Sequence, residues 1–392
     1  MIELTNEQIA AVYKMENWWN LRTKQVFEIS GGAGSGKTTL VNYMIDRLGL
    51  NPKKDVLFLC YCGKGASVMQ RNGLPAQTIH SAIYNYVKTV ERDSKGRAIL
   101  NKDTTVKRVK EFELKDELDG DIKLIVIDEG SMVPKNIADD ILSFGLPTIV
   151  LGDLNQLPPV FGDPYFLKDP DVILTQIMRQ EANSPIIYLA NEILQGRDVK
   201  FGEYGKSSVI RKQDFSIGKM VKADIILTGM NHTRHMVNEY FREKILGVPD
   251  KEYPYPGEKV ICRKNNWDKC IGGMYLTNGM TGEITTVYPD RYTRNTLRFD
   301  FKAEFMKKPY KNLTVDWNRL MLPPDVVSPE IDQKRFYYNK FEYAYAITVH
   351  SSQGSQWDNI VFMDDNFGFG EDRKKFLYTA ITRAAKTITI VR

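Results

Sequence analysis

The sequence predicts an α/β protein built from two parallel-sheet domains, each carrying an insertion. Apolar runs rich in Val and Ile recur along the 392 residues with helical stretches between them, a pattern typical of parallel strands covered by helices on both faces. There are more of these runs than one sheet around a phosphate loop needs, so we expect two sheets. The runs comprise residues 56–61, 124–127, 148–151, 172–174, 225–227, 360–363 and 388–391.

Two segments interrupt this alternation and are predicted to be insertions. Residues 84–121 are rich in charges of nearly balanced sign. Residues 251–340 contain short β-like runs separated by turn residues, which is typical of a small antiparallel barrel. The expected domains are therefore residues 1–83 with 122–180 for the first sheet, and residues 181–250 with 341–392 for the second.

The composition, 42% hydrophobic and 26% charged, is that of a soluble globular protein. No run approaches the ~18 apolar residues that span a bilayer, and residues 1–5 lack the basic-then-apolar pattern of a secretory signal. We therefore expect a cytoplasmic protein without a membrane partner. The net charge of +5 is compatible with nucleic-acid binding but too small to demonstrate it.

A phosphate-binding loop, GGAGSGKT, lies between an apolar strand at residues 25–30 and the start of a helical pattern. Glycines let backbone N–H groups wrap an anion, Lys37 reaches the β- and γ-phosphates, and the Thr38 hydroxyl ligates magnesium. The chain is therefore expected to bind ATP with Mg²⁺. The residues assigned to ATP in this stretch are Gly31, Gly32, Ala33, Gly34, Ser35, Gly36, Lys37, Thr38 and Thr39.

Residues 124–129 read LIVIDE, a buried strand that ends in two acids. Asp128 is expected to hold the magnesium shell, and Glu129 to orient and deprotonate the attacking water. Asp128 could instead cap a helix. Another apolar strand leads into residues 152–160, GDLNQLPPV, where Gln156 is a candidate sensor of the γ-phosphate. An amide that only satisfies its own loop is the alternative for Gln156.

Five motifs in this order resemble those of superfamily 1 helicases. Besides the phosphate loop they are residues 126–132, 152–160, 348–355 and 378–384. The resemblance covers nearly the whole chain and is nearest to the RecD-like branch, and within it to the compact phage helicases of the Dda type. It implies two RecA-like domains that clamp ATP in their cleft, single-stranded DNA crossing both domains, and 5′-to-3′ translocation.

The resemblance also implies roles in catalysis and nucleotide binding. It assigns Gln8 to adenine recognition, although Thr5 and Gln8 also match a helix-capping box in which Gln8 would bond the backbone. It assigns Arg179 and Arg383 to the phosphates, where a guanidinium delivered by the second domain neutralises charge on the transferred phosphoryl group. A surface salt bridge is the alternative for either arginine. The predicted catalytic set is Lys37, Glu129, Gln156, Arg179 and Arg383.

Two grips on single-stranded DNA follow from the same resemblance. The predicted contacts are Lys64, Thr78 and His80 in the first domain and Thr348, His350 and Gln353 in the second. For either histidine, a buried imidazole with satisfied partners is the alternative. Ser351 stands where relatives frequently carry a lysine. Arg234 and Asn238 match a further family motif, for which a nucleotide role and interdomain packing both stay open.

These expectations combine into an ATP-dependent DNA helicase that acts as a monomer on single-stranded DNA and on duplex–single-strand junctions. Residues 84–121 would hold a hairpin that splits the duplex, and residues 251–340 would brace it or guide the strand. A P-loop kinase or another ATPase without unwinding activity is the alternative from a different enzyme class. A partner protein that uses nucleotide only as a clamp is a third reading.

Overall fold

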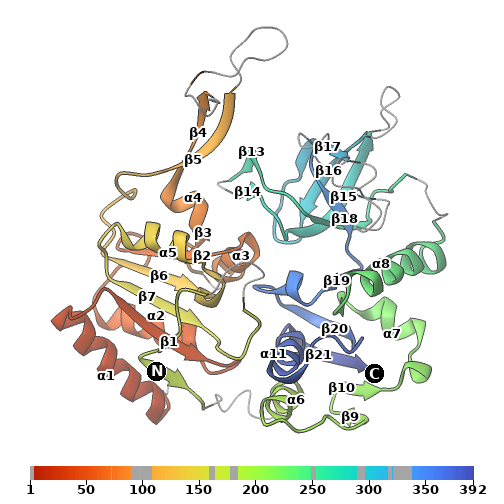
Figure 1. Cartoon of the computed structure of the whole chain (residues 1–392), viewed down its shortest axis with the longest axis horizontal. Coiled ribbons are helices and arrows are strands. Elements are labelled where there is room, and N and C mark those ends of the chain that lie inside the picture. Colours follow the sequence, from red (N-terminus) through yellow and green to blue (C-terminus); the bar gives the residue numbers. More distant parts are fainter. Residues whose placement is uncertain are drawn as a thin grey trace.

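The computed structural model describes residues 4–71, 73–90, 97, 108–158, 164–176, 184–248, 253–272, 274–288, 296–316, 320 and 338–392. Two α/β halves lie side by side, and a β-hairpin and a small antiparallel sheet project from the same end of the molecule (Figure 1). The α/β fold class predicted from the sequence is confirmed.

Six parallel strands form the first sheet, in the order β3-β2-β6-β7-β1-β8. The strands are β1 (Val26–Gly31), β2 (Val56–Cys60), β3 (Gln77–Thr78), β6 (Leu124–Asp128), β7 (Thr148–Gly152) and β8 (Val172–Leu174). The helical elements of this half are α1 (Asn6–Leu21), α2 (Lys37–Arg47), α3 (Gly63–Arg71), α4 (Ile79–Ile83), α5 (Lys135–Leu142) and the 3₁₀ turn η1 (Gly130–Met132).

The first sheet is apolar on both faces because helices cover both. Along β2, Phe58 and Cys60 pack into a core shared with α1 and α2, whereas Leu57 and Leu59 pack into a second core shared with α4 and α5. Successive side chains of a strand point to opposite faces, so burying both faces requires a continuous apolar run. That requirement explains why these strands could be recognised in the sequence.

The second sheet has the strand order β19-β11-β20-β21-β10-β9 and is parallel except for the edge strand β9. Its strands are β9 (Gly202–Tyr204), β10 (Ser207–Ile210), β11 (Ile225–Thr228), β19 (Ala346–Thr348), β20 (Trp357–Met363) and β21 (Ala384–Val391). Its helical elements are α6 (Pro185–Leu194), η2 (Lys212–Asp214), α7 (Ile217–Lys222), α8 (Asn231–Tyr240), the π-turn η3 (Phe241–Ile245), η4 (His350–Ser352) and α11 (Gly370–Ile381).

The small antiparallel sheet has the order β17-β16-β15-β12-β18. Its strands are β12 (Lys259–Cys262), β15 (Thr281–Tyr288), β16 (Thr296–Ala303), β17 (Tyr310–Asp316) and β18 (Phe341–Tyr343), and beside it runs the ribbon β13 (Asn266–Ile271) with β14 (Met274–Leu276). Strand β18 lies beyond the expected boundary at residue 340. It joins this sheet because Phe341 is fully buried in the small core and Phe341–Tyr343 pairs with β12.

A long hairpin made of β4 (Tyr84–Val90) and β5 (Arg108–Leu114) rises from the first half, within the segment 84–121. The pairing runs without a register shift from Tyr84 with Leu114 to Val90 with Arg108. Within the ranges described above, no helix combines the length and apolar character that a membrane crossing requires.

Candidate functional site

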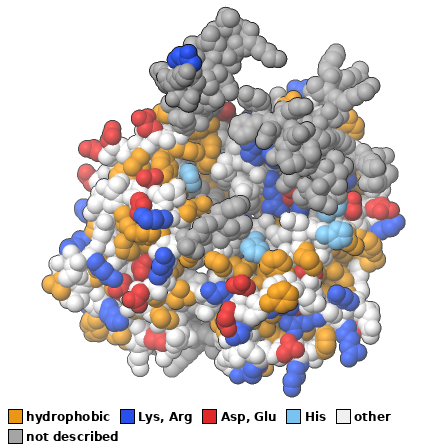
Figure 2. Space-filling model, viewed as in Figure 1, with side chains coloured by type: hydrophobic (Ala, Val, Ile, Leu, Met, Phe, Trp, Pro, Cys, Tyr) orange, Lys and Arg blue, Asp and Glu red, His pale blue; other side chains and the backbone are white. Residues whose placement is uncertain are grey.

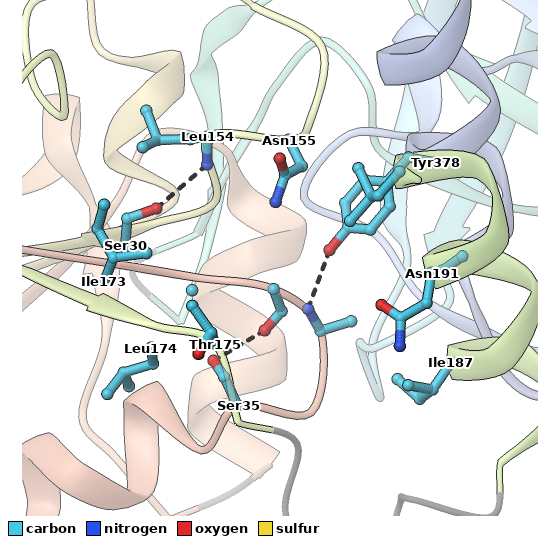
Figure 3. A pocket seen from close by; sticks show the side chains of 15 residues that line it. Ser30, Ser35, Leu154, Asn155, Ile173, Leu174, Thr175, Ile187, Asn191 and Tyr378 are labelled. Carbon is cyan, nitrogen blue, oxygen red and sulfur yellow. Dashed lines mark hydrogen bonds between the residues drawn. The ribbon is translucent and has the colours of Figure 1, made fainter. Parts of the chain in front are cut away.

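The phosphate loop connects the carboxyl end of β1 to the first turn of α2. Gly34 and Gly36 both have φ of +77°, a left-handed conformation that glycine adopts at little cost. The Lys37 ammonium donates to the carbonyl of Gly31 and, at 3.2 Å, to that of Gly32. The Ser35 hydroxyl donates to the Gly32 carbonyl at 2.9 Å (Figure 3). The cation is therefore held over the loop whose N–H groups can wrap an anion.

The two acids predicted from the sequence lie at the carboxyl end of β6. Asp128 Oδ1 accepts the Glu129 N–H at 3.0 Å. Burial raises the pKa of both carboxyls; the charge of Lys37 opposes that rise at Asp128, and the charge of Arg383 opposes it most at Glu129. Glu129 thus lies in the field of a cation from each half of the molecule. A carboxylate of raised pKa is better suited to accept a proton than an ordinary one.

The residues Thr38 and Asp128 fit a magnesium ion. Both offer hard oxygen donors, and the Asp128 carboxylate lies within the electrostatic reach of the lysine of the phosphate loop. Mg²⁺ is usually bound by one or two protein oxygens together with substrate phosphates and water. Among the described residues, no group of three or more His, Cys, Asp or Glu side chains could hold a metal. The triphosphate would therefore have to supply further ligands here.

Gln8 links the first helix to the phosphate loop. Its side-chain oxygen accepts the Thr5 N–H at 3.0 Å and its backbone N–H donates to the Thr5 hydroxyl at 3.2 Å, so the capping box is formed. The Gln8 amide nitrogen donates to the Ser35 carbonyl at 3.1 Å, and the side chain is buried. Gln8 therefore positions the loop in this structure. Its contact with adenine stays a prediction.

Tyr378 of α11 crosses from the second half to the phosphate loop. Its hydroxyl donates to Asp153 Oδ2 at 2.6 Å and accepts the Ala33 N–H at 3.2 Å (Figure 3). Burial, and then the Asp153 charge, raise the pKa of the Tyr378 phenol, so it is a neutral donor at pH 7. We did not assign Tyr378 from the sequence. It lies in the motif at residues 378–384, but its partners are 225 and 345 positions away.

A cavity of about 370 Å³ adjoins the loop, lined by both halves of the molecule. Gly32, Asn155 and Thr175 contribute from the first half, and Asn191 of α6 and Tyr378 of α11 from the second (Figure 3). The space beside the phosphate loop is therefore bounded by the two halves together.

The loop that follows β7 is held by the second half at three points. Tyr378 bonds Asp153, the Thr379 hydroxyl accepts the Leu157 N–H at 2.9 Å, and the Gln353 amide donates to the Leu157 carbonyl at 2.7 Å. Gln156 lies between the two anchored residues. The second half therefore holds the backbone on both sides of the candidate γ-phosphate sensor.

Of the two predicted arginines, Arg383 and Arg179, the structure describes Arg383. The Arg383 guanidinium is buried and donates to the carbonyls of Thr379, at 3.1 Å, and Ser355, at 3.3 Å. These neutral acceptors orient it, and its charge opposes the rise that burial causes in the pKa of Glu129, the predicted catalytic base. Arg179 lies outside the described residues.

A groove with a cavity of about 400 Å³ runs between the two halves, away from the phosphate loop. Thr78 and His80 line it from the first half, His350 and Gln353 from the second, and Trp267 from the β13–β14 ribbon. Thr348, the sixth predicted contact, is buried at the end of β19 beside this wall. The predicted contacts other than Lys64 are thus brought to one region.

The same four-residue structure recurs on both walls of this groove. The sequences TIHS at residues 78–81 and TVHS at residues 348–351 each begin with the last residue of a strand, β3 or β19. In each, the Thr and Ser hydroxyls lie 2.9 Å apart and the Ser N–H donates to the Thr hydroxyl at 3.3 Å. The two matching T-x-H-S sequences therefore form matching turns, one in each half.

Both groove histidines are partly buried among aromatic rings. The centroid of His80 lies 5.6 Å from that of Trp267 in a stacked arrangement, and the centroid of His350 lies 5.5 Å from that of Phe367. Burial lowers the pKa of both imidazoles. They are therefore neutral at pH 7, and would meet a nucleic acid by stacking or hydrogen bonding rather than by charge.

The structure does not bring Lys64 to this groove. Its ammonium lies 3.1 Å from Glu304 Oε2, donates to the Thr281 hydroxyl at 3.1 Å and sits 3.4 Å from the centre of the Trp357 ring. A nearly buried ammonium needs such a carboxylate partner. Lys64 thus ties the first half to the small sheet and to β20, in place of the DNA contact expected from the sequence.

Arg234 and Asn238 also make packing contacts in the described structure. Arg234 Nη1 lies 2.6 Å from Glu342 Oε2. The Asn238 side chain donates to the carbonyls of Tyr343 and Ala346 and accepts the Ala346 N–H. These contacts join α8 to β18 and β19, which favours the packing interpretation over a nucleotide role.

Comparison with known families and proteins agrees with these motifs. The AAA domain profile matches residues 17–162, and that of the UvrD-like helicase C-terminal domain matches residues 343–391. The ATP-dependent RecD2 DNA helicase of Deinococcus radiodurans is 26% identical over 285 residues, covering 67% of this chain and 35% of that protein. An uncharacterised protein of Methanocaldococcus jannaschii is 25% identical over 461 aligned residues, covering 95% of this chain and 37% of that protein. The chain spans about a third of the length of these curated relatives.

Solved structures of Pif1 helicases share the fold. One, described for DNA unwinding at forked double-stranded DNA, has a TM-score of 0.51 and 18% identity, covering 99% of this chain and 92% of that one. The Pif1 helicase of Candida albicans has a TM-score of 0.51 and 17% identity, covering 100% and 95%. At these identities the likeness establishes the two-domain α/β architecture.

Proposed function

We propose that the chain, which has the motifs and fold of superfamily 1 helicases of the UvrD/Pif1/RecD type, is an ATP-dependent DNA helicase. The observation that carries this proposal is the contact of α11 with the phosphate loop. Tyr378 bonds Ala33, and the neighbouring Thr379 bonds Leu157 beyond β7. Since the second half reaches the ATP site, hydrolysis there is coupled to the relative position of the two halves.

In this proposal the first half binds ATP and carries the base. Lys37 neutralises the β- and γ-phosphates, and the N–H groups of the phosphate loop wrap them. Glu129 orients and deprotonates the attacking water, and its raised pKa suits that task. A bound Mg²⁺, held by Thr38 and Asp128, would neutralise charge on the phosphates.

The second half completes the site in this proposal. Arg383 of the second half stabilises the negative charge that develops on the γ-phosphoryl group. Arg179, at the end of the proposed first domain, is assigned to the same phosphates by the family resemblance. Gln156 senses the γ-phosphate and passes its presence through the anchored loop to Thr379 and Gln353. Binding and release of ATP would then alternately close and open the two halves.

The groove provides the proposed track for single-stranded DNA. Its two T-x-H-S walls belong to different halves, so a closing motion changes the distance between two grips on one strand. Hydroxyls and backbone N–H groups suit phosphates, and the aromatic rings suit bases. The β4–β5 hairpin projects beside this track and is our proposed strand-splitting element (Figure 1).

Finer features of the proposal come from the resemblance to RecD-like helicases. They are 5′-to-3′ polarity, kinship with the compact Dda type, action as a monomer at duplex–single-strand junctions, and a cytoplasmic location. The proposed first domain combines residues 1–83 and 122–180, with the hairpin inserted between them. The second combines residues 181–250 with the segment after Tyr343, and the small sheet is inserted there.

The test is to measure ATP hydrolysis and unwinding on duplexes with a 5′ tail, a 3′ tail or no tail, in DNA and RNA versions. We expect DNA-stimulated hydrolysis, and unwinding only of the 5′-tailed DNA. Lys37→Ala should all but abolish hydrolysis, whereas Lys135→Ala, an exposed lysine on α5, should leave it unchanged.

The other possible outcomes would support different functions or a different polarity. Hydrolysis that single-stranded DNA does not stimulate would indicate a P-loop kinase or another ATPase. Tight ATP binding without turnover would indicate a nucleotide-dependent clamp. Unwinding from a 3′ tail would reverse the polarity and leave the helicase proposal intact.

A further inference from the structure

Arg234, Glu342 and Arg263 form a cluster of three charged side chains beside the groove. Arg234 Nη1 and Arg263 Nε both lie 2.6 Å from Glu342 Oε2. The side chains of Arg234 and Glu342 are 3% and 6% exposed, and that of Arg263 is 15% exposed. Two guanidinium groups thus share one carboxylate oxygen.

The most exposed member of this cluster faces the groove. Arg263 directly follows β12, lines the groove, and donates from Nη1 to the Ser351 hydroxyl at 2.9 Å. Ser351 closes the T-x-H-S structure of the second half. Arg263 therefore brings a cation from the small sheet to the end of this T-x-H-S structure.

The described residues that line the groove supply few other positive charges. Its histidines are neutral at pH 7, and Lys64 is paired with Glu304 elsewhere. Of the described residues that line the groove, Arg263 alone carries a permanent positive charge. Charges of both signs are mixed over the described part of the face shown in Figure 2.

We propose that Arg263 binds a backbone phosphate of the strand in the groove, and that Glu342 positions it for this contact. The inference rests on the proposed function, since it names a contact on the same track. A guanidinium has five N–H donors in a planar fork that matches a phosphate. Glu342 and Ser351 accept from two of them, which fixes the plane of the fork.

Salt dependence of binding measures this contact. For single strands, each phosphate contact contributes about 0.7 to the slope of log affinity against log salt concentration. Arg263→Gln should lower that slope by about 0.7, which corresponds to about fivefold weaker binding at 0.1 M salt. Arg263→Lys keeps the charge and should retain the slope. The affinity for fluorescent oligo-dT is measured from about 0.05 to about 0.5 M NaCl, and the slope of its logarithm against the logarithm of the salt concentration is compared between variants.

Matched variants separate a phosphate contact from a change in net charge. Lys206→Gln removes an exposed lysine from the turn between β9 and β10 and should leave the slope unchanged. Adding Ser351→Lys to Arg263→Gln should restore the slope of the original protein, because position 351 adjoins the site of the lost guanidinium. If thermal unfolding shows that Arg263→Gln does not fold, Ser351→Glu neutralises Arg263 in place and should give the same loss.

A folded Arg263→Gln protein with the slope of the original protein would overturn the phosphate contact. So would an equal loss of slope in Lys206→Gln, because that result would report net charge alone. If the unaltered protein does not bind oligo-dT at all, the helicase proposal itself fails. Binding of oligo-dT by the unaltered protein thus distinguishes failure of the helicase proposal from failure of the Arg263 contact.

Discussion

The hydroxyl of Tyr378 touches the phosphate loop and Asp153 at once, although it belongs to the other half of the molecule. A hydrogen bond to a carboxylate is stronger than one between neutral groups, and this one is buried. The contact therefore contributes to holding α11 against the ATP site. It is a positioning contact, since the described structure places the phenol on the loop backbone and on Asp153.

Replacing Tyr378 by Phe should lower the kcat of ATP hydrolysis by roughly 10- to 100-fold, because hydrogen bonds to charged groups contribute about 1.5–3 kcal/mol. The ring and its packing are kept, so the fold should persist. Steady-state hydrolysis with saturating single-stranded DNA is the measurement. Tyr188→Phe, on the exposed face of α6, is the control. An unchanged kcat for Tyr378→Phe would show that the contact is only structural.

Arg383 tests whether the second half contributes to the transition state. Arg383→Ala should lower kcat by about 10³-fold or more with a small change in ATP affinity, because arginine fingers act mainly in the transition state. Nucleotide binding and turnover must be measured separately. A large loss of affinity at unchanged turnover would instead assign Arg383 to ground-state binding.

Among the elements, the π-turn η3 is joined to the small sheet by a buried ion pair. Arg242 Nε lies 2.6 Å from Glu258 Oε1, and the two side chains are 7% and 3% exposed. Glu258 also accepts the Tyr255 N–H at 2.8 Å. The pair thus holds the start of β12 against η3, which directly continues α8.

Removing one partner of this pair should destabilise the protein strongly. Arg242→Met leaves Glu258 buried without its partner, and such changes cost about 3–5 kcal/mol in the free energy of unfolding. Urea unfolding measures it. Arg197→Met, which breaks the exposed pair with Glu192, should change stability little. Equal effects of the two variants would contradict this account.

The β4–β5 hairpin can be tested as an element. Residues 91–103, which belong to the segment between the two strands, lie outside the described residues except for Arg97. Replacing them with a short glycine-serine turn should leave DNA-stimulated hydrolysis intact, because neither the ATP site nor the groove is touched. Unwinding should fall sharply without the element proposed to separate the strands. Full unwinding by the shortened protein would move that role elsewhere, most directly to the small sheet.

Over the whole molecule, the parts that could be predicted are those encoded locally. Continuous apolar runs such as residues 124–127 are evident from a few residues, and the phosphate loop is a contiguous motif. Lys64 could not be predicted, because its partners Thr281 and Glu304 lie more than 200 positions away. Arg263 and Tyr378 were missed for the same reason. Long-range pairing decides which way a side chain faces.

The path of the chain from β18 to β19 has a mechanical consequence. Only Ala344 and Tyr345 separate the last strand of the small sheet from a strand of the second sheet. Asn238 bonds backbone groups on both sides of this link, and the ring of Tyr345 stacks on Phe241 with centroids 4.3 Å apart. Such a link leaves little freedom for hinge bending. The small sheet should therefore turn with the second half as a rigid lever arm, so that a slight rotation at the ATP cleft becomes a larger sweep at its far end.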